Sequence, residues 1–287
     1  MTPRTKLCHD QSVRLMTWNL WWKFGPWEER QDPILDEIRR VDADVVSLQE
    51  VWATDGDDQA QILADKLEYN VVRSVTADGS AQHFGNAVLS RHPLTLLAQL
   101  DLPGADGAPT ARTALIVKVD RPPAPRLVVN THLDWLYHAS ATRQAQLQAI
   151  VDAIDHHRET PDPENPLPSI ITGDLNGQPE SQEIRRLTGL DPGYHPSLIF
   201  IDCWAAVGDG SGHTWTRDNP NAAEASWPRR RLDYVLVNWP RKKPFCSPLS
   251  ARLAGLGHVD ESTGRREMVP SDHYAVVVEL DDERAAG

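Results

Sequence analysis

Short apolar runs rich in β-branched residues recur along the whole chain, and polar stretches separate them. Runs of about four to eight such residues are typical of β-strands, so the pattern predicts a protein built around sheet. Eight runs predict strands: Arg14–Asn19, Val45–Gln49, Asn86–Ser90, Leu115–Val119, Leu127–Thr131, Ile170–Gly173, Leu232–Val237 and Tyr274–Leu280.

Three other segments repeat their apolar residues with the period of a helix that buries one face. The clearest is Ser140–His157, for which Ser140 is the expected N-cap. A second helix is expected to begin at Asp32, with Pro33 in the first helical position. A third is expected over Gln59–Leu67.

Proline, glycine and charged residues gather in stretches that are typical of surface loops rather than interdomain linkers. These stretches are Asp101–Thr110, Arg121–Pro125 and Glu159–Pro168. Because strand patterns continue from end to end, we expect an α/β protein with a single domain over residues 1–287 and flexible ends at 1–12 and 282–287.

The charge of the chain narrows the range of partners. Its formal net charge is −12, whereas affinity for duplex nucleic acid comes mostly from a basic surface. The run Arg229–Arg231 has two interpretations, a local basic patch or a solvated loop. Nucleic acid is therefore a partner that the charge does not favour.

No run approaches the ~18 apolar residues of a membrane span, and residues 1–15 lack the apolar segment of a secretory signal. We therefore expect a cytoplasmic protein, monomeric by default. Cys8, Cys203 and Cys246 form no CxxC pair, so neither a disulfide framework nor a thiolate zinc site is indicated. We expect small core or surface residues at these positions.

Polar side chains stand where several predicted strands end. Strand ends are common places for sites, because a rigid element aims the side chain while the following loop leaves it open. Each residue alone is a weak signal, since such residues usually form turns or face solvent. Their number and order carry the prediction. They are Asn19, Glu50, His132, Asp174, Asn176, Asp233, Asp272 and His273.

The chemistry of this set points to a reaction class. Carboxylate and amide oxygens suit a hard divalent cation, Mg²⁺ or Mn²⁺. Two histidines and a further aspartate supply proton transfer and stabilise developing negative charge. The combination fits the hydrolysis of a phosphate ester.

The motifs that carry these residues resemble, in the same order, those of the endonuclease/exonuclease/phosphatase superfamily. They are TWNL, LQEVW, GNAVLSRHPL, NTHLDW, GDLNGQP, RLDYVLV and PSDHY, and they cover nearly the whole chain. The resemblance implies a four-layered α/β sandwich, in which two mixed, mainly antiparallel sheets pack face to face and helices cover the outside. It also implies a metal-dependent phosphoesterase.

The resemblance implies a role for each site residue. Glu50 corresponds to the principal metal ligand, with Asn19 and Asp272 beside it, directly or through water. Asp174 corresponds to the residue that orients or deprotonates the attacking water, and Asn176 to one that positions the nucleophile or a phosphate oxygen.

The remaining roles concern charge at the phosphoryl group. His132 and His273 would bracket this group and stabilise its charge. Asp233 resembles the acid that hydrogen-bonds the C-terminal histidine, fixes its tautomer and favours its protonated form. Which residue is the general base and which the general acid stays open at this point.

His132 argues against an abasic-site endonuclease, because those members of the superfamily usually carry tyrosine at this place in the motif. The segments Ile201–Trp204 and His213–Thr216 resemble a stretch of tyrosyl-DNA phosphodiesterase 2, as does Arg112. Arg112 is either a phosphate contact or a strand-edge arginine paired with a surface carboxylate.

Asn86 and Trp215 are further candidate substrate contacts. Tryptophans also crowd the loop after Asn19, where Trp21, Trp22 and Trp27 are candidates for an aromatic wall. Trp18 lies within a strand pattern and is expected in the core.

The leading hypothesis is a metal-dependent phosphodiesterase or phosphatase that acts on a small or single-stranded substrate. A nuclease or DNA-repair phosphodiesterase is the alternative within enzymes, and the net charge of −12 counts against its grip on duplex DNA. A non-catalytic binding module with the same fold is the alternative from another class.

Overall fold

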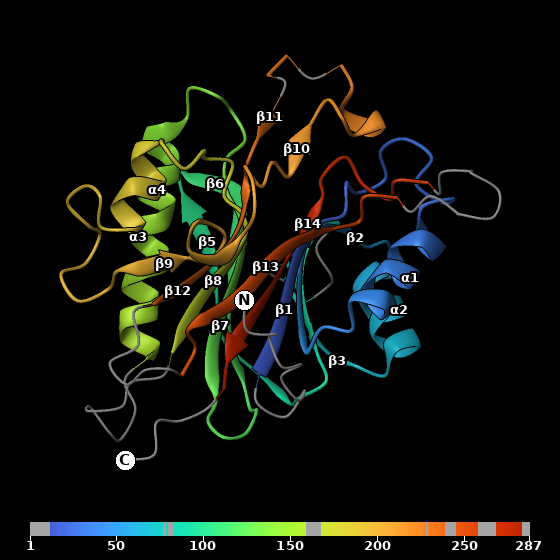
Figure 1. The fold of residues 1–287 in the computed structure, drawn as a ribbon, viewed down its shortest axis with the longest axis horizontal. Helices are drawn as coiled ribbons and strands as arrows, with labels where there is room; N and C mark the ends of the chain where they lie inside the picture. The colour runs from blue at the N-terminus through green and yellow to red at the C-terminus, as the bar shows by residue number, and fades with distance from the viewer. Residues whose placement is uncertain are drawn as a thin grey trace, which may run out of the picture.

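The computed structural model describes residues 12–76, 79, 83–158, 168–224, 226–227, 229–238, 245–257 and 268–282. Two sheets lie side by side at the centre of the molecule, and helices cover their outer faces (Figure 1). The layers are therefore helix, sheet, sheet and helix, and the predicted four-layered α/β sandwich is confirmed.

The first sheet has six strands in the order β13-β14-β1-β2-β4-β3. Its parallel pair, β1 and β2, lies at the centre, and all other neighbours are antiparallel. The strands are β1 (Ser12–Asn19), β2 (Val45–Trp52), β3 (Asn70–Arg73), β4 (Phe84–Ser90), β13 (Pro248–Ala254) and β14 (Ala275–Asp281).

The second sheet also has six strands, in the order β5-β6-β7-β8-β12-β9. Its central pair, β7 and β8, is again the parallel one. The strands are β5 (Leu94–Pro103), β6 (Pro109–Val119), β7 (Arg126–His132), β8 (Ser169–Asp174), β9 (Phe200–Asp202) and β12 (Asp233–Asn238).

Helices α1 and α2 cover the first sheet, and α3 and α4 cover the second (Figure 1). A short pair, β10 with β11, rises above the sheets, and the 3-10 helix η2 lies in the loop that connects them. The bounds are α1 (Gln31–Val41), α2 (Gln59–Leu67), α3 (Ser140–His157), α4 (Gln182–Leu187), α5 (Cys203–Val207), β10 (Trp215–Thr216), η2 (Pro220–Ala222) and β11 (Arg229–Arg230).

Three apolar layers hold the sandwich together. In β1, Leu15 packs into the layer between the sheets, whereas Met16 and Trp18 pack outward against the helices. A strand that is buried on both faces needs apolar residues at nearly every position, which explains the continuous runs in the sequence. The prediction that Trp18 is a core residue is confirmed, since its side chain is fully buried.

Buried polar contacts fix the position of one sheet relative to the other. Thr172 Oγ1 donates to Ser47 Oγ at 2.7 Å, and Gln49 Nε2 donates to Asn130 Oδ1 at 2.7 Å. The Asn130 amide also donates to the carbonyls of Leu48 and Ala87, both at 2.8 Å. Apolar packing alone tolerates sliding, but directional hydrogen bonds do not, so these contacts align the strand ends of the two sheets.

All eight predicted strands are present, and those that the sequence pattern missed lie mainly at sheet edges. β13 and β3 are the two edges of the first sheet, and β5 and β9 are the edges of the second. Edge strands are covered on fewer sides, so their sequences carry more polar residues and a weaker apolar signal. β10 and β11 contain only two residues each, too few for any pattern.

Three local expectations were wrong. Helix α3 has Ala139 at its N-cap, and the Ser140 hydroxyl instead donates to Glu183 Oε2 at 2.7 Å. Helix α1 begins at Gln31, so Pro33 is its third residue, which is still within the first turn where no backbone donor is needed. Half of Asp101–Thr110 belongs to β5 and β6, which form a hairpin, and only residues 104–108 form the loop that connects them.

Ser12 and Asp282, which the sequence analysis assigns to the flexible ends, are part of the fold. Ser12 begins β1, and the Asp282 carboxylate is buried against Arg121 and Arg126. Residues 1–11 and 283–287 lie outside the described residues, as do Cys8 and 159–167. Cys203 and Cys246 are buried free thiols. Within the described part of the chain, no helix combines the length and the apolar composition that crossing a bilayer requires.

Candidate active site

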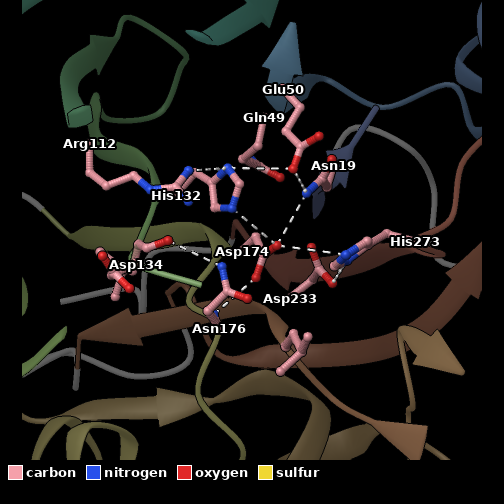
Figure 2. Close-up of polar contacts among 12 residues, drawn as sticks. Asn19, Gln49, Glu50, Arg112, His132, Asp134, Asp174, Asn176, Asp233 and His273 are labelled. Carbon is pink, nitrogen blue, oxygen red and sulfur yellow. Dashed lines mark hydrogen bonds and ion pairs between the residues drawn. The ribbon is translucent and has the colours of Figure 1, made fainter. Parts of the chain in front are cut away.

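The candidate site lies where the central parallel pairs of both sheets end, so that side chains from distant parts of the sequence meet (Figure 2). In the first sheet Asn19 is paired with Gln49, and Glu50 follows directly. In the second sheet Asp174 stands between His132 on β7 and Asp233 on β12. Strand register within each sheet, together with the contacts that align the two sheets, therefore brings these carboxylate, amide and imidazole groups to one edge of the sandwich.

Glu50 owes its direction to a bulge in β2. The register between β2 and β4 shifts between Leu48 and Val51, and Glu50 adopts a left-handed backbone conformation with φ of 54°. A bulge redirects the side chain that an ordinary strand would place on alternate faces. Left-handed backbone is unfavourable for a glutamate, and such strain is commonly found at functional sites.

The turn after β8 is equally specific. Gly173 has φ of 139°, and a Cβ atom there would lie 1.9 Å from the Thr131 carbonyl oxygen. Only glycine therefore allows β7 and β8 to approach closely at this point. Asn176 is left-handed with φ of 50°, its N–H donates to Asp174 Oδ1 at 2.9 Å, and its side-chain amide donates to the Leu133 carbonyl at 3.1 Å.

Asp174 is the centre of the polar cluster (Figure 2). Its Oδ2 accepts a hydrogen bond from Asn19 Nδ2 at 3.2 Å, and it lies 3.5 Å from His132 Nε2 and 3.8 Å from His273 Nε2. Burial acts to raise the pKa of Asp174, but His273, His132 and the Asn176 N–H outweigh it and lower this pKa. Asp174 is therefore an ionised carboxylate between two imidazoles.

His132 is neutral, with a defined tautomer. Arg112 Nη1 lies 3.2 Å from His132 Nδ1, and because a guanidinium can only donate, Nδ1 must accept and the proton must sit on Nε2. Burial and then the Arg112 charge lower the pKa of His132 to about 3. The Nε2–H is thus available to donate toward Asp174 or toward a bound oxyanion.

His273 has the opposite character. Its Nδ1 lies 2.8 Å from Asp233 Oδ2, and both groups are buried. Burial acts to lower the pKa of His273, but the carboxylates of Asp233, Asp174 and Asp272 outweigh it and raise this pKa well above 6.5. The predicted pairing of Asp233 with His273 is present in the structure, and it holds a charged imidazolium with Nε2 facing Asp174.

The electrostatics around Glu50 favour a bound cation. Burial and then the Asp272 charge raise the pKa of Glu50 to about 7, and burial also raises that of Asp272. Two largely buried carboxylates that repel each other are what a hard divalent ion neutralises. Trp21 N–H donates to Asn19 Oδ1 at 2.9 Å, which leaves the Asn19 amide nitrogen facing Glu50 at 3.0 Å. This geometry fits a contact through water better than direct ligation by Asn19.

Asp174, Asp233 and His273 form a second group in which one potential ligand atom from each lies within 4.8 Å of the others. Donor spacing alone is therefore compatible with a metal ion there. A metal in this place would compete with the proton that the Asp233–His273 hydrogen bond holds. We therefore favour the Glu50 and Asp272 carboxylates as the residues that hold the ion.

The structure also identifies positioning residues that sequence patterns missed. Arg30 is fully buried, and its guanidinium donates to five backbone carbonyls, those of Leu20, Trp21, Trp22, Phe24 and Pro270. It thereby joins the loop after Asn19 to the segment before Asp272. Burial lowers the pKa of Arg30 to about 10, against the opposing effect of Asp272 and Glu50.

Ser271 makes a second connection of this kind. Its hydroxyl donates to the Asn19 carbonyl at 2.6 Å and accepts from the His273 N–H at 3.2 Å. The serine of the PSDHY motif therefore joins the two ends of the site, and its place directly before Asp272 and His273 was the only available signal.

The candidate substrate contacts lie on both sides of this cluster. Arg112, Asn86 and His132 line one small recess. Within the described residues, no ion pair joins Arg112 to a surface carboxylate. The interpretation of Arg112 as a strand-edge arginine paired with such a carboxylate is therefore not supported. The Asn86 amide donates to Thr113, which ties β4 to β6. The Trp215 side chain hydrogen-bonds Asp272 and so helps to orient it.

The sequence allowed the run Arg229–Arg231 to be a local basic patch or a solvated loop. Neither interpretation describes all three residues. Arg231 is buried, and its Nη1 contacts both carboxylate oxygens of Asp202 at 2.8 and 2.7 Å. Arg230 is buried and donates to the Asn176 carbonyl at 3.2 Å. Arg229 is the exposed member, 3.5 Å from Asp218.

The sequence and the fold are both similar to those of known proteins. The model of the endonuclease/exonuclease/phosphatase family matches residues 16–273, which include all eight residues of the candidate site. The chain belongs to this family. It is also 28% identical over 195 residues to YbhP of Escherichia coli strain K12, a match that covers 63% of this chain and 74% of YbhP.

Solved structures of family members have the same fold. Truncated TDP2 of Caenorhabditis elegans aligns with a TM-score of 0.70 at 22% identity, covering 94% of this chain and 98% of that one. TDP2 of D. rerio, complexed with a single-strand DNA product, gives 0.71 at 20% identity over 94% and 99%. A family protein from Beutenbergia cavernae gives 0.64 at 24% identity over 96% and 73%. At these identities the likeness concerns the fold.

Proposed function

We propose that this family member is a divalent-metal-dependent phosphoesterase, in which activated water attacks phosphorus. The observation that carries the proposal is the environment of Asp174, an ionised carboxylate between a neutral and a charged imidazole. The largely buried carboxylates of Glu50 and Asp272 add the residues that would hold Mg²⁺ or Mn²⁺. When bound, such an ion neutralises phosphate charge and acts as a Lewis acid.

Each side chain has a part in this reaction that its geometry supports. The Asp174 carboxylate accepts a proton from the attacking water, and Asn176, whose N–H holds Asp174 Oδ1, keeps it in position. The His273 imidazolium neutralises charge that develops on the phosphoryl oxygens, while the His132 Nε2–H donates a hydrogen bond to them. Arg112, beside His132, is placed to hold a phosphate oxygen.

We further propose a small-molecule or single-stranded substrate. The chain carries a net charge of −12, and two of the three arginines at 229–231 are already engaged inside the protein. Duplex DNA requires a broad basic surface for its grip. A DNA-repair phosphodiesterase is the second candidate, favoured by the likeness in fold to TDP2 and by the single-strand DNA product in the D. rerio structure.

A substrate panel tests the proposal. It consists of bis(4-nitrophenyl) phosphate, nucleotides, an inositol phosphate, sphingomyelin and a 5′-tyrosyl oligonucleotide, each with Mg²⁺, with Mn²⁺ and with EDTA. We expect turnover only with metal, and a loss of about 10²–10³-fold or more in Glu50→Gln. Glu68→Gln is the matched control, because Glu68 is exposed after α2 and is also left-handed.

Activity that survives EDTA, or a fully active Glu50→Gln protein, would sink the proposal. Protein that is inert toward every phosphoester with either metal would support the non-catalytic binding module instead. A strong preference for the tyrosyl oligonucleotide, with binding that weakens steeply with salt, would favour the DNA-repair candidate.

A further inference from the structure

An exposed cluster of aromatic side chains lies beside the candidate site and takes no part in the reaction described above. Trp135 and Tyr137 follow His132 in the loop between β7 and α3, and Trp227 lies between β10 and β11. The exposed fractions are 60% for Trp135, 50% for Tyr137 and 51% for Trp227. We call these three residues the aromatic shelf. Adjacent exposed aromatic rings on a folded protein commonly mark a binding surface.

The rings of the aromatic shelf are arranged, not scattered. The Tyr137 and Trp227 ring centroids are 5.9 Å apart with an interplanar angle of 31°, although the two residues belong to different loops. The Arg230 guanidinium lies 4.8 Å from the Tyr137 centroid, within the range of a cation–π contact. Tyr137 therefore has one partner at its face and a second ring beside it.

Arg230 also joins the aromatic shelf to the reaction centre. Its Nη2 donates to the Asn176 carbonyl at 3.2 Å, and the Asn176 N–H holds Asp174 Oδ1 at 2.9 Å. Two contacts thus separate the Tyr137 ring from the turn that carries Asp174. A molecule whose phosphate sits at Asp174 would have its neighbouring groups within reach of these rings.

The loop that carries Trp135 and Tyr137 is held rigidly. Arg143 is buried, donates to the carbonyls of Asp134 and Leu136 at 3.1 and 2.8 Å, and forms an ion pair with the buried Glu183 at 2.6 Å. The Asp134 N–H donates to the Gln146 side chain at 3.0 Å. A preformed aromatic surface loses little entropy when a ligand binds to it.

We infer that the aromatic shelf is a stacking subsite for a planar base, so that the substrate is a nucleotide or a single-stranded nucleic acid end. This inference rests on the proposed function and specifies its substrate class. Base stacking suits flat, cation-backed rings such as Tyr137, whose face contacts the Arg230 guanidinium. The net charge of −12 makes an anionic lipid surface a poor partner.

Direct binding to the wild-type full chain with Mg²⁺ tests the subsite, by calorimetry with AMP and with ribose 5-phosphate. Both ligands carry the same phosphate, and only AMP carries a base. We expect AMP to bind about tenfold more tightly. Tyr137→Leu and Trp227→Leu should each reduce this preference to about twofold or less, with ribose 5-phosphate affinity unchanged. Tyr137→Phe and Trp227→Phe keep a ring and should retain the preference.

The control is Phe24→Leu. Phe24 is also an exposed aromatic residue in contact with another ring, that of Trp22, but both belong to the loop after β1 and not to the aromatic shelf. This substitution should leave the preference for AMP intact. Equal binding of the two ligands, no binding of AMP, or loss of the preference in Phe24→Leu overturns the inference. The inference is also overturned if the wild-type protein cosediments with phosphatidylcholine vesicles and Tyr137→Leu abolishes this binding. The aromatic shelf would then be a lipid-binding surface. Phosphate release, followed in parallel with the substrate panel, reports the proposed activity separately.

Discussion

Glu50 combines two unfavourable features in one residue. Its backbone is left-handed, which costs an L-residue roughly 1–2 kcal/mol, and its largely buried carboxylate is repelled by that of Asp272. Neither feature helps the fold, since the bulge that creates both interrupts the pairing of β2 with β4. The proposed function accounts for such a residue, because a bound divalent ion would compensate the charge.

The raised pKa of Glu50 predicts how replacing this carboxylate changes the free energy of unfolding. Folding raises this pKa from 4.5 to about 7, so the folded protein binds a proton that the unfolded chain releases between these values. The metal-free protein therefore loses stability as pH rises from about 4.5 to 7. At pH 8 without metal, Glu50→Gln should be more stable than wild type, on the order of 2–3 kcal/mol.

Urea unfolding with EDTA at pH 8 and at pH 4.5 measures this difference. The gain should be present at pH 8 and vanish at pH 4.5, and Glu68→Gln should behave as wild type at both. A Glu50→Gln protein that is less stable at pH 8 would contradict the electrostatic account of the site.

The charged state of His273 gives a prediction about the pH dependence of activity. The neighbouring carboxylates raise its pKa well above 6.5, so the imidazolium persists through neutral pH and is lost only in alkali. Asp233→Asn removes the carboxylate in contact with Nδ1 and lowers that pKa. The alkaline limb of the kcat/KM profile should then move to lower pH, by about one unit or more. An unshifted limb would assign it to another group.

At the scale of elements, the sequence predicted the centre of each sheet and missed its edges. The eight predicted strands are buried on both faces, whereas β3, β5, β9 and β13 are half-covered. The same limit applies to the site. Strand-end position identified Asn19 and His132, but the bulge at Glu50 depends on β4, and the Arg30 contact with the Pro270 carbonyl joins segments far apart in the chain. Local patterns contain no record of such contacts.

The pairing of β7 with β8 predicts the effect of a single methyl group. Gly173→Ala would place Cβ against the Thr131 carbonyl, with φ of 139° also unfavourable for alanine. The two strands must separate where they carry His132 and Asp174. We expect a loss of stability of about 3 kcal/mol or more and a larger loss of activity.

Circular dichroism on heating, combined with the phosphoesterase assay, measures both effects. Gly56→Ala is the control, because a Cβ there has no neighbour within 4 Å and the backbone is not left-handed. Its Tm and activity should equal those of wild type. A Gly173→Ala protein of unchanged Tm would show that the close approach of β7 and β8 is not required.

At the scale of the whole molecule, the candidate site draws on residues from position 19 to position 273. In the proposed function, a metal ion held by Glu50 and Asp272 would therefore crosslink β2 to the segment before β14. Binding to the folded state alone stabilises by about 2.7 kcal/mol at a metal concentration 100 times Kd. For a protein of this size, Tm should rise by about 5–10 °C.

Thermal shift assays with Mg²⁺, Mn²⁺ and EDTA check this prediction. The rise should disappear in Glu50→Gln and remain in Glu68→Gln. A rise of equal size in Glu50→Gln would place the ion elsewhere, for example at Asp174, Asp233 and His273.

The pairing of β1 with β14 has a consequence for how the protein is made. Ser12 in β1 is opposite Asp281 in β14, so β1 must wait for a partner strand that is synthesised much later. At about 5–20 residues per second this wait lasts tens of seconds. During that time Leu15 and Met16 lack their final cover, and His273 has not yet been synthesised. The nascent chain therefore needs protection from aggregation until β14 has been synthesised, and a product that stops before His273 lacks part of the candidate site.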